Sequence, residues 1–196
     1  MLGGSLWGDR GHAPAPMLAA IGKIILLHTE MTGNLFLFFS EFLDVPSSCR
    51  QMIFDTANNR ARVDLIKRLV ADSGATADEE RTVLEALKAY DVATENRNIL
   101  AHSSLYTAEG RGFTFFKEPT PSTPTGWSYH VTTADLREQA ERFEALNYHI
   151  VFVWNAFFSR RWGEQTPLPK TPPQPRKLSL FRLPEAPEGE QPPPRS

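Results

Sequence analysis

The chain has 196 residues, of which 41% are hydrophobic and 11% aromatic, and its formal net charge at pH 7 is -2. This apolar content excludes a wholly disordered protein, and the near-neutral charge excludes a bulk electrostatic attraction to nucleic acid or anionic lipid. The single cysteine, Cys49, excludes an intrachain disulfide framework and a multi-cysteine zinc site. We expect a cytoplasmic protein without a membrane-spanning segment, because charged and polar side chains interrupt the most apolar stretch, residues 21–43.

Four segments have the apolar spacing of amphipathic helices. The first, residues 16–43, opens on a proline, a residue favoured in the first turn of a helix. The second, residues 47–71, starts at serines that can cap a helix. The third, residues 76–105, starts with a threonine and an acidic run that suits the positive end of the helix dipole. The last covers residues 134–160, behind Thr133 and Asp135 as its opening signal.

A different pattern precedes the last helix. Residues 113–117 and 127–131 are rich in aromatic and β-branched side chains and flank a Pro, Thr, Ser and Gly loop, which predicts a β-hairpin. The sequence therefore predicts an all-α fold, a small bundle of about four helices with a short hairpin inserted before the last helix. This domain covers residues 17–162, after a flexible leader over 1–16, and a disordered proline-rich tail follows over 163–196.

The third predicted helix carries polar side chains on the stripe that we expect to face the bundle. Polar groups in such a position are costly unless they bond one another, face a cleft or meet a partner chain. A satisfied buried network and a helix edge exposed to water are the structural explanations, and a functional site is the other. The stripe contains Asp91, Thr94, Asn98 and His102, and Arg97 and Glu95 lie on its two flanks.

The same helix contains the string ENRNILAHSSLY, in which Arg97 and Asn98 are followed by His102. This arrangement resembles the ribonuclease members of the HEPN family (higher eukaryotes and prokaryotes nucleotide-binding). These all-α domains carry an Arg and a His separated by four to six residues, often with Asn directly after the Arg. Many members have a tyrosine two places after the His, whereas this chain has Ser104 there.

The resemblance implies a metal-independent endoribonuclease, a toxin or defence effector, that needs no cofactor. In such enzymes the ribose 2′-hydroxyl attacks the adjacent phosphate, so the protein moves protons and stabilises charge. His102 would transfer a proton, Arg97 would bind phosphate oxygens, and Asn98 would orient the imidazole or the ribose. Asp91, Thr94 and Glu95 would support these groups. The partners implied are RNA, a second copy of the chain in a homodimer, and a protein antitoxin or regulator.

Other charged features have structural alternatives. Arg142 and His149 repeat the Arg-to-His spacing, but they lie on a helix dense in core aromatics and we interpret them as structural. A locally basic segment of the second helix could line an RNA channel or could be an ordinary solvated face. Its basic residues are Arg60, Arg62, Lys67 and Arg68.

The alternative function is a non-catalytic HEPN-like module that binds RNA or another protein. The tail offers one feature for such a role. Residues 176–184, RKLSLFRLP, form an amphipathic island in a proline-rich context, a composition suited to docking in a groove. The interpretation we favour from sequence is that this island is part of a free tail.

Overall fold

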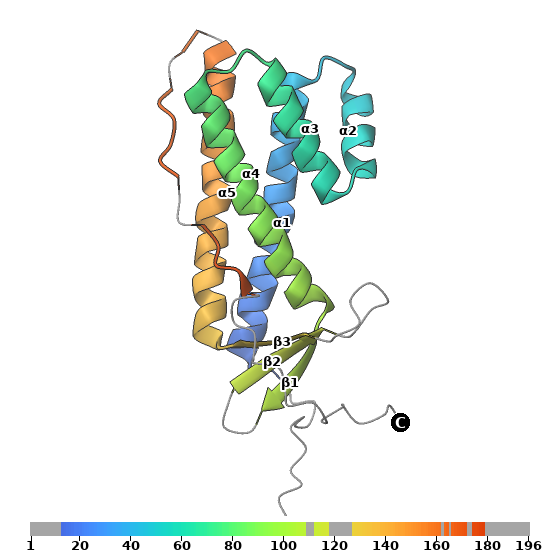
Figure 1. Ribbon diagram of the computed structural model, residues 1–196, viewed down its shortest axis with the longest axis vertical. Helices are drawn as coiled ribbons and strands as arrows, with labels where there is room; N and C mark the ends of the chain where they lie inside the picture. Colours follow the sequence, from blue (N-terminus) through green and yellow to red (C-terminus); the bar gives the residue numbers. More distant parts are fainter. Residues whose placement is uncertain are drawn as a thin grey trace, which may run out of the picture.

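A computed structural model describes residues 13–108, 112–117, 127–161, 163–164, 166–171 and 174–178. Three long helices form the bundle: α1 and α5 point the same way and α4 returns antiparallel to them (Figure 1). Two short helices, α2 and α3, pack beside one end, and a small sheet lies across the other end (Figure 1). The helices are α1 (Ala15–Phe42), α2 (Ser47–Thr56), α3 (Asn59–Asp72), α4 (Ala77–His102) and α5 (Thr133–Arg161).

Three helices, α3, α4 and α5, begin where side chains bond the free main-chain N–H groups of the first turn. The helices α1 and α2 instead follow Pro14 and Pro46 without a side-chain cap, so the predicted serine cap at the start of the second helix is wrong. Thr76 and Glu79 form a reciprocal capping box at the start of α4, where Thr76 and the acidic run predicted that a helix begins. Thr132 and Asp135 make the equivalent pair at the start of α5, with main-chain to side-chain distances of 2.9 and 3.1 Å, one residue before the predicted cap.

The predicted second helix is two helices, because the side chain of Asn58 accepts a hydrogen bond from the N–H of Ala61 and starts a new helix. Ala57, just before it, is extended. Asparagine competes in this way with a continuing helix because its short side chain bonds nearby main-chain groups. The bundle therefore has five helices within the described residues instead of about four.

The sheet contains one strand more than the predicted hairpin. Its strands are antiparallel in the order β1-β2-β3, and the hairpin is confirmed as β2 and β3. The extra strand comes from the expected end of the third helix, because α4 ends at His102 and the chain is extended from Ser103. Leu105, Phe115 and Tyr129 lie opposite one another and face the core. The strands are β1 (Ser104–Ala108), β2 (Gly112–Lys117) and β3 (Trp127–Val131).

The core is continuous across the bundle, the sheet and α3. Large apolar side chains of α1 and α5 meet along most of their length, for example where the rings of Phe38 and Phe157 pack edge to face at 6.1 Å. In the part of the chain that the structure describes, no helix is both long and apolar enough to cross a membrane.

Part of the predicted free tail packs on the bundle. Residues 166–171 and 174–178 run along α4 and α5 (Figure 1), and Leu178 belongs to the core with no exposed surface. The predicted tail over 163–196 thus includes a part that packs on the bundle. The predicted leader likewise overlaps α1, which begins at Ala15. The predictions for residues 1–12 and 179–196 lie outside the described residues.

Candidate functional site

The predicted motif occupies the last two turns of α4. Arg97 and Asn98 are partly buried, and Nη1 of Arg97 donates a hydrogen bond to Oδ1 of Asn98 at 2.9 Å. His102 is the last residue of the helix and is exposed. Asn98 and His102 are four residues apart and so lie on the same side of the helix. Among the described contacts, none joins His102 to Arg97 or Asn98. One chain therefore carries the three groups on the same two helical turns, but its described contacts pair only Arg97 with Asn98.

The orientation of α4 differs from the one that its polar stripe predicted. Asp91 and His102 are exposed, whereas the expected stripe would have buried them, and Thr94 and Asn98 are half-buried. The buried face passes instead through Tyr90, Ala93 and Leu100. The apolar spacing missed this rotation because small alanines, which are weak markers of a buried face, line the contact with the neighbouring helices.

Four polar residues meet between α1 and α4, and we call them the α1/α4 polar cluster: His28, Thr32, Tyr90 and Thr94. Nε2 of His28 lies 3.0 Å from Oγ1 of Thr94, and the His28 ring stacks on Tyr90 with centroids 5.3 Å apart. Thr32 Oγ1 donates to the carbonyl of His28 at 2.9 Å. Its 2.8 Å bond with the Tyr90 hydroxyl therefore has Tyr90 as the donor, because a hydroxyl has one proton to give.

This cluster lies within the electrostatic reach of Arg97. Burial, with a smaller contribution from the positive charge of Arg97, lowers the pKa of His28 from 6.5 to about 4. Burial raises the pKa of Tyr90, while its hydrogen bonds to Thr32 and Thr94 oppose that shift. His28 is therefore a neutral imidazole at neutral pH. His28 is 1% exposed, so it can hold Thr94 and Tyr90 in position but cannot contact a substrate.

The three predicted supporting residues contact three different neighbours. Thr94 belongs to the α1/α4 polar cluster, and Glu95 forms an ion pair with Lys177 of the C-terminal segment at 3.3 Å. Asp91 lies near α3, where loss of part of its hydration and the charge of Asp64 raise the pKa of Asp91 while Lys67 and Arg60 oppose the rise. The sequence therefore identified polar positions that the fold uses separately.

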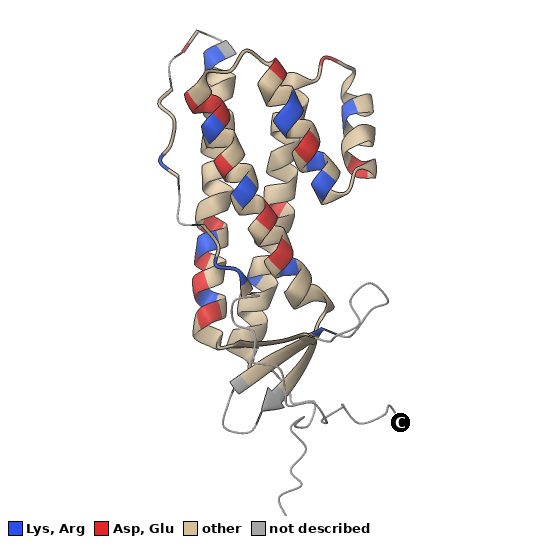
Figure 2. Cartoon of the chain, in the orientation of Figure 1, with Lys and Arg blue, Asp and Glu red and all other residues tan. Residues whose placement is uncertain are grey.

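Of the basic residues predicted to line an RNA channel, one packs against the bundle and the others lie at the surface. Arg62 packs its guanidinium over the Phe54 ring at 4.6 Å and donates to the carbonyl of Phe54 at 2.9 Å. Arg60 and Arg68 are exposed, and Lys67 lies 3.9 Å from Asp64 in a weak ion pair. Figure 2 shows that acidic residues are interspersed among the basic ones on α3, so this surface is mixed in charge.

Asn96 was not identified from the sequence, although this residue is only 1% exposed. Its amide donates to the main-chain carbonyl of Arg176 at 2.7 Å and accepts from the main-chain N–H of Leu178 at 2.9 Å. Because both partners are main-chain atoms of a segment without regular structure, no spacing in the sequence could have indicated this pairing.

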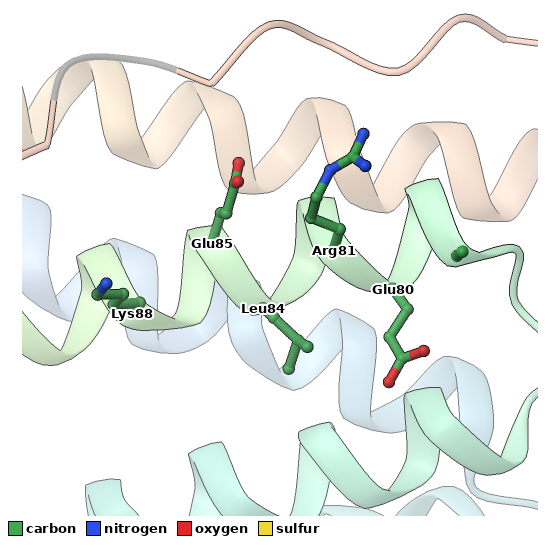
Figure 3. A pocket seen from close by; sticks show the side chains of 6 residues that line it. Glu80, Arg81, Leu84, Glu85 and Lys88 are labelled. Atoms are coloured by element: carbon green, nitrogen blue, oxygen red, sulfur yellow. The ribbon is translucent and has the colours of Figure 1, made fainter.

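One hollow in the described part of the molecule lies at the opposite end of α4 from the motif. Its volume is about 440 Å³ and every side chain that lines it comes from α4. Figure 3 shows that Glu80 and Leu84 extend to one side of that helix and Arg81 and Glu85 to the other. A hollow with walls from one helix does not enclose a ligand, and we assign no chemistry to it. Its remaining lining residues are Ala77 and Lys88.

Comparisons with known proteins add no family assignment. No protein-family model, no curated protein and no solved structure matches the chain. The likeness to the HEPN family therefore depends on Arg97, Asn98 and His102 and on the helical architecture around them.

Proposed function

We propose that this chain is a metal-independent endoribonuclease of the HEPN type, of the kind that acts in the cytoplasm as a toxin or defence effector. The observation that carries the proposal is the hydrogen-bonded pair Arg97–Asn98 beside the exposed His102 at the end of a long helix. An exposed imidazole can meet RNA, and a neighbouring guanidinium can bind its phosphate.

The reaction would use the ribose 2′-hydroxyl as the nucleophile against the adjacent phosphorus. His102 would take the hydroxyl proton or give a proton to the departing 5′-oxygen. Arg97 would bind the non-bridging phosphate oxygens, on which negative charge grows in the transition state. Asn98 already accepts a hydrogen bond from Arg97, so it would hold the guanidinium in place and leave its own amide N–H groups for the ribose.

A homodimer would supply the second set of groups. One chain has one such imidazole, and proton removal and proton donation are best served by two. Asn98 and His102 lie on the same side of α4 as Asp91, near which α3 packs. Because Asn98 and His102 are nearer the C-terminal end of α4 than Asp91, this end is the part of that side we assign to the partner copy. Pairing of two copies there would bring the two motifs across one cleft, with the exposed Arg60 and Arg68 as candidates for contacts with the RNA backbone.

The test is cleavage of single-stranded or structured RNA by the purified full chain in EDTA, with 2′,3′-cyclic phosphate ends on the product. His102→Ala should lower the rate about 10²–10⁴-fold, because it removes proton transfer. Arg97→Ala should lower it by a similar factor, as expected for one lost transition-state donor. Light scattering should give a particle of twice the 22.0 kDa chain mass.

A matched control is Arg81→Ala, which removes an exposed arginine near the start of α4 and should leave the rate unchanged. Both site variants should keep the circular dichroism spectrum of the wild type. Unfolding of His102→Ala, or a wild-type chain that cuts no RNA, would contradict the catalytic proposal. A folded chain that binds RNA without cutting it would support the alternative, a non-catalytic HEPN-like module that binds RNA or protein.

A further inference from the structure

The C-terminal segment lies in a groove between α4 and α5, and the groove contacts mainly its main chain. Asn96 makes two hydrogen bonds, to the carbonyl of Arg176 at 2.7 Å and from the N–H of Leu178 at 2.9 Å. These are the two bonds that a neighbouring β-strand would make to the same residues. A side-chain amide therefore replaces a strand partner.

The contacts continue along α5 in the opposite chain direction. Nη1 of Arg142 donates to the carbonyl of Gln174 at 2.9 Å, and His149 hydrogen-bonds to the main chain of Lys170. Main-chain contacts of this kind bind an extended peptide whatever its sequence. Selectivity has to come from the side chains that the groove buries.

Two side chains of the segment are buried in this part, Pro175 and Leu178. They are three residues apart, and the two residues between them, Arg176 and Lys177, are exposed and basic. Lys177 pairs with Glu95 at 3.3 Å. The groove thus binds a proline and a leucine three positions later, with positively charged residues between them.

The contact of Thr171, on the N-terminal side of these two anchors, is polar. Oγ1 of Thr171 donates to a carboxylate oxygen of Glu85 at 2.7 Å. Glu85 and Glu95 are two carboxylates of α4 that contact the segment, whose charged residues, Lys170, Arg176 and Lys177, are all basic. This charge complementarity favours a basic peptide over a neutral or acidic one.

We propose that the α4/α5 groove is a peptide-binding site for extended segments of the form Pro-x-x-Leu with basic residues between the two anchors. The chain's own residues 174–178 occupy the site, and a segment of the same chemistry on a partner protein docks there when the internal segment is released. The internal segment competes at an effective concentration in the millimolar range, because it is tethered to the groove. This site shares Glu95 with the predicted supporting residues of the motif, but it uses neither Arg97, Asn98 nor His102 and stands without the ribonuclease proposal.

The test uses the full chain carrying Leu178→Asp, which places a charge in the leucine pocket and releases the internal segment. A fluorescently labelled peptide of residues 166–178 should bind this variant in an anisotropy titration. The wild-type chain should bind the same peptide at least tenfold more weakly, because its groove is occupied. A peptide that itself carries Leu178→Asp should not bind, and the full chain with Leu26→Asp, at an exposed leucine of α1, should behave as the wild type.

Adding Arg142→Ala to Leu178→Asp should weaken peptide binding about tenfold or more, since a hydrogen bond from a charged donor is lost. If Leu178→Asp does not fold by circular dichroism, Leu178→Ser takes its place. Equal peptide affinity of the wild type and the released variant would overturn the proposal. So would a folded, released variant that does not bind the peptide at all.

Discussion

Replacing Leu178 with alanine should destabilise the whole domain, although this residue lies in a segment whose composition predicts disorder. Leu178 has no exposed surface and belongs to the same core as α1, α4 and α5. Buried leucine-to-alanine changes cost about 2–5 kcal/mol. The segment can detach when its anchor is shortened, which limits the loss to its docking free energy. We therefore expect the lower end, about 2 kcal/mol, and a melting temperature lowered by roughly 4–8 °C for a domain of this size.

The measurement is urea unfolding at neutral pH, followed by circular dichroism, with wild type and variant compared at equal slope. The matched control is Leu26→Ala, because Leu26 is 67% exposed on α1 and its truncation should change stability by no more than about 0.5 kcal/mol. An unfolding free energy of Leu178→Ala within the same margin would refute the packing of this segment and, with it, the peptide groove.

Two further predictions concern the interior of the bundle. Burial lowers the pKa of His28 from 6.5 to about 4, so the unfolded chain binds the extra proton first and stability should fall by up to about 3 kcal/mol as the pH drops from 6.5 towards 4. In His28→Gln the pH dependence of urea unfolding should be flatter, and an unchanged profile would contradict the burial. Arg62→Ala should lower the free energy of unfolding by about 1–2 kcal/mol, because it removes the contacts of Arg62 with Phe54. Arg68→Ala, at an exposed position, should change it by no more than about 0.5 kcal/mol. Equal losses for both variants would show that the packing over Phe54 does not stabilise the domain.

Features that depend on neighbours in the sequence could be predicted. The apolar spacing located the long helices, and Thr76 with Glu79 marked the start of α4. The hairpin strands were also predictable, because their aromatic and β-branched residues flank a turn-forming Pro, Thr, Ser and Gly segment. These features are local, since helix capping and side-chain periodicity involve residues only a few positions apart.

The tertiary structure decided what the helices face. The spacing placed the polar residues of α4 on one stripe and its flanks, but Asp91 lies near the charged residues of α3, Thr94 bonds His28 on α1, and Glu95 pairs with Lys177. A helix can rotate by part of a turn without changing its own hydrogen bonds, so only the shapes of its neighbours determine which polar residues meet.

The C-terminal segment shows the same limit most clearly. Asn96 bonds the main chain of residues 80 and 82 positions further along, in a stretch with neither helical nor strand periodicity. A free chain of that composition would remain disordered, because it cannot bury enough apolar surface by itself. It becomes ordered here because α4 and α5 together supply a buried amide, an arginine and a leucine pocket, and that combination exists only after the bundle has folded.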